Sequence, residues 1–139
     1  MKKAIIVWGG WAGHEPEPCA NIVGELLRED GFAVEITNDL DIFGSPQLEK
    51  ADLLVPVITG ETLEKPHANA LVEAVRGGLG LGGHHGCLAT SFKESAPFRY
   101  VSGVTWVAHP GNIIDFRIAV TRQDDPLMEG IPDFDYRSE

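Results

Sequence analysis

The stretch KKAIIVWGG, residues 2–10, is a short apolar run that ends in two glycines. Strands buried on both faces of a sheet have uninterrupted apolar runs of this kind, whereas strands with one wet face alternate apolar and polar residues. Residues 2–10 therefore predict a central strand, and a strand of that kind is typically followed by a helix in α/β proteins.

Helical and strand-like segments alternate after this first strand. Apolar residues recur every three or four positions from Glu15 to Gly31 and from Pro66 to Arg76, and each predicted helix stops at a glycine. Three further apolar runs predict strands: FAVEIT (32–37), ADLLVPVI (51–58) and GLGLGG (78–83). Because right-handed crossovers join parallel strands, we expect a flavodoxin-like doubly wound sheet with the strand order second, first, third, fourth.

The pattern changes beyond residue 88. TWVAHPGN (105–112) is rich in turn-forming residues, and DFRIAVT (115–121) places Phe116, Ile118 and Val120 on one face. This alternation predicts a half-exposed antiparallel strand at the sheet edge. The chain of 139 residues is 43% hydrophobic, and its sequence contains no repeat or linker, so we expect one domain over residues 1–139.

Composition excludes several classes of function. Eleven basic and twenty-one acidic side chains give a net charge of -10, which would repel a nucleic-acid backbone. No apolar run is long enough to span a membrane, and the apolar stretch near the N-terminus is too short for a signal peptide. Cys19 and Cys87 do not make a disulfide framework. We therefore expect a soluble cytoplasmic protein that binds neither nucleic acid nor membrane.

Histidines gather where the predicted strands end. Four of the five follow a strand or open the next helix, and the fifth lies in the later turn-rich segment: His14, His67, His84, His85 and His109. Ligands of doubly wound sheets bind beyond the carboxyl ends of the strands. The histidines therefore predict a functional site at that end of the sheet.

The segment GGHHGC, residues 82–87, admits more than one interpretation. A dinucleotide-binding fingerprint is disfavoured, because the glycines that formally match it lie inside the strand and not in the turn after it: Gly78, Gly80 and Gly83. A strained strand–turn–helix elbow fits better, with either His84 or His85 at its tip. Cys87 is then either a thiolate at the start of the helix or, as we favour, a small buried residue.

The chain contains, in this order, VWGGWAGHEPE, GGLGLGGHHGC, WVAHPGN and DPLMEGIPDF. Together these segments resemble the trehalose-utilization, or ThuA-like, family. The resemblance spans nearly the whole chain and implies a fold similar to class I glutamine amidotransferases. It also places the family's histidine on His85, where the related amidotransferases carry their cysteine nucleophile. The resemblance therefore argues against glutamine hydrolysis and implies a carbohydrate substrate such as trehalose or an oxidised disaccharide.

The chain departs from this family in three places. Cys87 stands where a small residue is usual, and Asp125 stands where many members have a histidine. The chain also stops at Glu139, whereas comparable members continue into further strands. We therefore expect residues 1–139 to lack the family's C-terminal strands and to cover the apolar surface left behind by forming a homo-oligomer.

Imidazoles and a carboxylate from separate loops suit either acid–base catalysis or a divalent metal such as zinc. We expect His14, His85 and Glu139 to be catalytic, or His14, His85 and His109 to converge on a metal in one pocket. Groups that contact the sugar would come from the same loops: Trp11, Glu15, His84, Trp106, His109 and Asn112. For Trp11 and Trp106, however, packing in the core is the more common fate of such side chains.

Two functions of different classes fit these residues. The first, implied by the resemblance, is the processing of a carbohydrate with His14 and His85 as acid and base or as metal ligands. The second is a non-catalytic ligand-binding or assembly domain that keeps an amidotransferase-like fold without its nucleophile.

Overall fold

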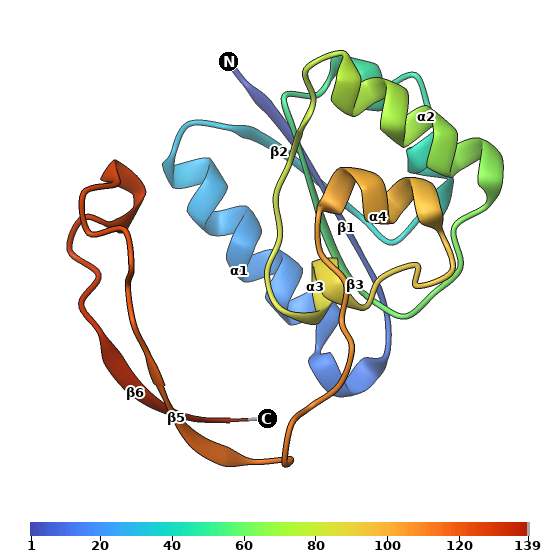
Figure 1. Cartoon of the computed structure of the whole chain (residues 1–139). Coiled ribbons are helices and arrows are strands. Elements are labelled where there is room, and N and C mark those ends of the chain that lie inside the picture. The colour runs from blue at the N-terminus through green and yellow to red at the C-terminus, as the bar shows by residue number, and fades with distance from the viewer. Residues whose placement is uncertain (139) are drawn as a thin grey trace. The chain divides into compact units, whose positions relative to one another are not determined.

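The computed structural model describes residues 1–138 and divides the chain into two compact units. The first unit spans residues 1–106, and the second begins at Val107. The first contains a four-stranded parallel sheet with helices, and the second contains a two-stranded antiparallel sheet (Figure 1). The α/β fold class predicted from the sequence is confirmed.

The parallel sheet has the strand order β2-β1-β3-β4, as predicted. Its strands are β1 (Lys3–Gly10), β2 (Ala33–Thr37), β3 (Leu53–Thr59) and β4 (Gly80–Leu81). β1 pairs in parallel with β2 on one side and with β3 on the other. Ala4, Ile5, Ile6 and Val7 are completely buried. The apolar run that opens the chain is therefore a central strand.

Helices cover both faces of this sheet, with α1 (Pro16–Glu29) on one face and α2 (Lys65–Arg76) and α4 (Ala96–Ser102) on the other (Figure 1). The core on the α1 face includes Ile6, Ala20, Val55, Val57 and Cys87. The core on the other face includes Ile5, Val7, Leu54, Ile58, Leu71, Phe92 and Phe98. Neighbouring strand residues enter different cores because strand side chains point to alternate faces.

Among the helices of residues 1–138, none combines the length and the apolar character that a membrane span requires.

The long helices agree with the prediction to within two residues at each end. Pro16 begins α1, as suits a residue that lacks a backbone N–H. Gly31 ends the segment with a φ of +84°, and its N–H donates to the carbonyl of Arg28 at 3.0 Å. Between the long elements lie short turns of helix: η1 (Ala12–His14), η2 (Leu40–Gly44), η3 (Leu48–Lys50) and α3 (Gly86–Ala89).

The fourth strand is shorter than predicted. Only Gly80 and Leu81 pair with β3, and not the whole of residues 78–83. Gly78 has a φ of +112°, which lies outside the strand conformation. The paired part of this strand is therefore limited to two residues, and the segment that carries His84 and His85 follows it.

The second unit corrects the prediction for residues 115–121. The strand is antiparallel, as expected, but β5 (Ile114–Ile118) pairs with β6 (Phe134–Ser138) in a sheet of its own, beyond η4 (Pro126–Met128). Its expected place at the edge of the main sheet is therefore wrong.

Opposite side chains explain why β5 and β6 pair with each other. On one face, Arg117 lies 3.2 Å from Asp135 and Arg137 lies 2.7 Å from Asp115. The other face pairs apolar side chains, namely Phe116 with Tyr136 and Ile118 with Phe134. Cross-strand pairs of this kind stabilise a strand partnership that alternation within one strand cannot identify.

Candidate functional site

A cavity of about 200 Å³ lies where strands of the parallel sheet end. It is lined by the segments that follow β1 and β4 and by the last residues of β3. The lining residues are His14, Pro16, Cys19, Val57, Thr59, His84, His85 and Cys87. Doubly wound sheets bind their ligands at this end. Two of the candidate catalytic residues, His14 and His85, therefore meet where a ligand is expected.

The loop after β1 turns sharply at Gly10. Its φ is +81°, and a Cβ at this position would lie 2.0 Å from the carbonyl oxygen of Thr59. Glycine alone satisfies both demands. The backbone N–H of Trp11 donates to the same carbonyl at 3.1 Å, and η1 then carries the chain to His14. Gly10 thus allows His14 to lie at the end of β3.

Three neighbours surround the imidazole of His14. Its Nδ1 lies 2.7 Å from Oγ1 of Thr59, the last residue of β3. The ring meets the indole of Trp11 edge to face with centroids 4.7 Å apart, and it meets the ring of His85 in the same way at 5.4 Å. Because Nδ1 is bonded to the protein, Nε2 is the ring nitrogen left for a ligand.

His85 occupies the tip of the strand–turn–helix elbow. Its backbone has a φ of 48° and a ψ of -135°, and the positive φ falls on His85 and not on His84. A positive φ is uncommon for a residue with a Cβ, so this turn holds backbone strain. α3 starts directly after it, at Gly86. Of the two elbow registers that the sequence allows, the backbone adopts the one with His85 at the tip.

Gly86 lets the two histidines approach each other. A Cβ at this position would lie 3.3 Å from Cε1 of His14 and 3.1 Å from Oγ1 of Thr90. Both distances are shorter than an ordinary carbon contact of about 3.5–4.0 Å. The missing side chain therefore leaves room for the ring of His14 against the elbow.

Cys87 lies beneath the elbow. Its side chain is 7% exposed and belongs to the core that contains Ile6 and Ala20. Burial raises the pKa of the Cys87 thiol, and the neighbouring Cys19 raises it further. The thiolate that a nucleophile requires is therefore disfavoured. This supports Cys87 as a small core residue and not as a reactive group.

Two residues that the sequence analysis did not single out fasten the elbow to β3. The hydroxyl of Ser91 is completely buried and lies within hydrogen-bonding distance of the carbonyl oxygens of Ile58 and Cys87, 2.7 Å from the second. The N–H of Phe92 donates to the carbonyl of Gly60 at 2.9 Å. No motif marks these positions in the sequence, because their role depends on α3 packing against β3.

Arg99, on α4, holds the same segment from another element. Its guanidinium donates to the carbonyl of Ala89 at 3.1 Å, to that of Ser91 at 3.0 Å and to that of Lys93 at 3.3 Å. The planar group presents several donors in fixed directions, which suits one side chain binding three carbonyls. The backbone behind His85 is therefore held at several points.

The family model for ThuA, which describes trehalose utilisation, matches residues 3–139. The chain belongs to the trehalose-utilisation family. The solved structure of a ThuA-like protein from Bacteroides uniformis matches with a TM-score of 0.77 and 19% sequence identity. The match covers 99% of this chain and 58% of that protein, and at this identity it supports the fold alone. None of the curated proteins compared with this sequence matches it.

The other candidates in the first unit of this ThuA-family chain have different surroundings. Trp11 is 61% exposed beside His14, and His84 lines the cavity. Glu15 is exposed at a φ of 46°. Trp106 is 37% exposed, and the Nζ atom of Lys93 lies over its ring, 4.3 Å from the ring centroid. Neither tryptophan is a core residue.

The remaining candidates belong to the second unit or to the residue that the structure does not describe. His109 and Asn112 belong to the second unit, and Glu139 lies outside the described residues. The convergence of His109 with His14 and His85 on one metal therefore stays a prediction. Within residues 1–138, no three His, Cys, Asp or Glu side chains are grouped so as to hold a metal ion.

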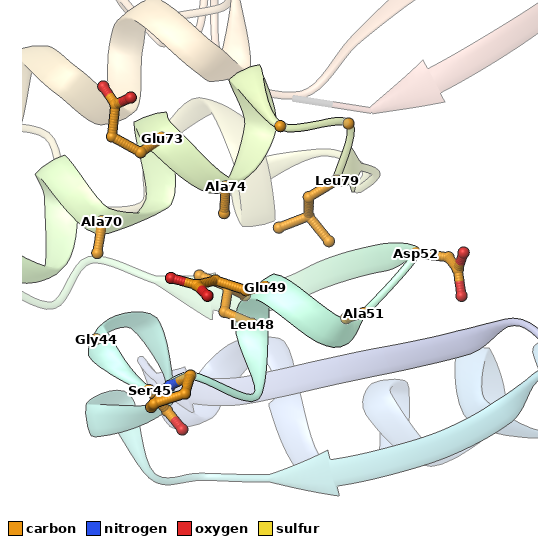
Figure 2. Close-up of a pocket in the computed structure, with 13 residues that line it drawn as sticks. Gly44, Ser45, Leu48, Glu49, Ala51, Asp52, Ala70, Glu73, Ala74 and Leu79 are labelled. Atoms are coloured by element: carbon orange, nitrogen blue, oxygen red, sulfur yellow. The ribbon is translucent and has the colours of Figure 1, made fainter.

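A larger cavity of about 520 Å³ lies at the opposite end of the parallel sheet, between α2 and the η2–η3 segment (Figure 2). Two of its carboxylates are already engaged. Asp52 accepts the backbone N–H of Lys3 at 2.7 Å, and Glu73 lies 2.8 Å from Arg76. No histidine or cysteine lines this cavity. The paired imidazoles of His14 and His85 therefore lie at the smaller cavity.

Proposed function

We propose that this member of the trehalose-utilisation family acts on a carbohydrate, with His14 and His85 as the acid and base that contact one sugar ring. The observation that carries the proposal is the edge-to-face pair of imidazoles at a cavity beyond the carboxyl ends of the strands. The centroids of the two rings lie 5.4 Å apart. Imidazoles exchange protons near neutral pH, which suits reactions at the hydroxyl and carbonyl groups of sugars.

The size of the cavity favours a single ring as the part of the substrate that is bound there. Its volume of about 200 Å³ is below the range of about 300–1,000 Å³ that is usual for larger ligands. Trp11 adds an exposed indole beside His14, and aromatic faces of this kind pack against the apolar faces of sugars. A disaccharide would therefore place one ring at the histidines and leave the other outside.

The surroundings of Cys87 argue against glutamine hydrolysis. That reaction needs a thiolate, and the thiol of Cys87 is buried with a raised pKa. By resemblance to the family, His85 takes the position at which the amidotransferases have their cysteine. An imidazole at a strained elbow supports proton transfer or ligand binding in its place.

Turnover tests this proposal. The full chain is incubated with trehalose and with keto-disaccharides, and the products are followed by NMR and mass spectrometry. We expect conversion by the wild-type chain and its loss in His14→Gln and His85→Gln. His67→Gln is the matched control, because His67 packs against Gly44 and does not line the cavity.

The same experiment separates catalysis from simple binding. If the sugars raise the melting temperature but are not converted, the chain is a ligand-binding domain and the catalytic proposal fails. Conversion that persists in His85→Gln would also overturn it.

A further inference from the structure

Thr59 holds the loop after β1 through two different groups. Its backbone carbonyl accepts the N–H of Trp11 at 3.1 Å, and its hydroxyl Oγ1 lies 2.7 Å from Nδ1 of His14. The second contact joins the end of β3 to a residue 45 positions away in the sequence. The side chain of Thr59 therefore acts on the imidazole of His14, while its backbone holds the loop.

The hydroxyl of Thr59 has one hydrogen to donate. Among residues 1–138, Nδ1 of His14 is the one protein group bonded to this oxygen. If Nδ1 carried the proton, it would donate to the oxygen and the hydroxyl hydrogen would have no protein acceptor. If Nδ1 is bare, the hydroxyl donates to it and both groups are satisfied. The geometry therefore favours the tautomer that carries its proton on Nε2.

The surroundings of the ring favour this one orientation. Turning the imidazole by 180° would place carbon Cδ2 against the oxygen of Thr59 and lose the hydrogen bond. The edge-to-face contacts with Trp11 and His85 and the space above Gly86 further confine the ring. The hydrogen bond from Thr59 thus determines both the orientation of the His14 ring and the nitrogen that carries its proton.

We propose that Thr59 is a positioning residue that fixes the tautomer of His14, so that Nε2–H is a hydrogen-bond donor to whatever enters the cavity. This assigns different roles to the two histidines: His14 donates to the substrate oxygen, and His85 is the base. The division of roles rests on the proposed function, whereas the tautomer of His14 does not.

The tautomer is measured by two-bond 1H–15N correlation spectra of the full chain with 15N-labelled histidine. Spectra are recorded at a pH of about 8.5, where imidazoles are ordinarily neutral. His14→Gln identifies the signals of His14 by their loss. In the wild-type chain we expect a protonated Nε2 and a bare Nδ1, and the opposite pattern would overturn the proposal.

Thr59→Val and Thr59→Ser form the matched pair of variants. Valine keeps the shape of the side chain and the backbone bond to Trp11 but removes the hydroxyl, whereas serine keeps the hydroxyl. The ratio of Nε2–H to Nδ1–H should fall about 2- to 10-fold in Thr59→Val, as expected from the loss of one neutral hydrogen bond. It should stay as in the wild type in Thr59→Ser.

An unchanged ratio in Thr59→Val overturns the proposal, and the wild-type spectrum tests it even if that variant does not fold. The outcome is separable from the sugar assay. A fixed Nε2–H tautomer without turnover would contradict the proposed function alone, and turnover with the proton on Nδ1 would contradict the role of Thr59 alone.

Discussion

His85→Gly should give a more stable folded chain than His85→Ala. The backbone at this position has a φ of 48° and a ψ of -135°, a conformation that glycine adopts freely and that a Cβ opposes. Both variants lose the imidazole and its contact with His14. The difference between them therefore isolates the strain that the Cβ imposes on the elbow.

The expected difference follows from two opposing effects. Residues held in sparsely populated backbone regions cost about 1–3 kcal/mol, which alanine retains and glycine releases. Glycine in turn gains about 0.4–1 kcal/mol of freedom in the unfolded chain, which lowers stability. The free energy of unfolding of His85→Gly should therefore exceed that of His85→Ala by about 1 kcal/mol. The wild-type chain retains this strain at the residue that the proposed function requires.

Urea denaturation with linear extrapolation measures the difference. Asn69, exposed within α2, provides the matched control. In a helix interior glycine is about 1 kcal/mol less favourable than alanine, so Asn69→Gly should be less stable than Asn69→Ala. The glycine variant should thus have the higher free energy of unfolding at residue 85 and the lower one at residue 69. If His85→Ala is as stable as His85→Gly or more stable, the turn is not strained and this reasoning fails.

Four further outcomes are expected. Ser91→Ala should lower the free energy of unfolding by about 1–3 kcal/mol in urea, because a buried carbonyl oxygen loses its hydroxyl donor; an unchanged midpoint would contradict this. Gly10→Ala should cost about 2–5 kcal/mol from its positive φ and the clash with the carbonyl of Thr59, and a folded variant of wild-type stability would refute the close approach of the two loops at this turn. Because burial raises the pKa of Cys87, the unfolded thiol ionises first; the wild type should lose stability relative to Cys87→Ala as the pH rises above about 8.5, and parallel pH curves would count against it. The exposed apolar face of the β5–β6 pair is consistent with the expected homo-oligomer, which light scattering tests, and a monomer at high concentration would exclude it.

The sequence determined the parallel sheet and its order. The run at residues 2–10 has no polar alternation, so it had to be buried on both faces, and its central place in the sheet follows. Right-handed crossovers then left few arrangements for the other strands. The end of the sheet that carries His14 and His85 was predictable for the same reason, since both follow strands.

The alternation of apolar and polar residues did not predict which strand β5 pairs with. Residues 115–121 alternate as an exposed strand does, but β5 pairs with β6 through Arg117, Asp135 and their neighbours, and not with the main sheet. A period of two reports which side chains share a face, and it carries no information on which strand lies alongside.

Only the tertiary structure decided how the site is held. The bond between Thr59 and His14 spans 45 residues, and it forms because β1 and β3 are neighbours and Gly10 permits their loops to touch. The folded backbone has its positive φ at His85 and not at His84, which the residue pattern left open and the family resemblance favoured. A local sequence pattern encodes burial and turns, whereas a hydrogen bond between distant side chains depends on distances that exist only after the sheet has formed.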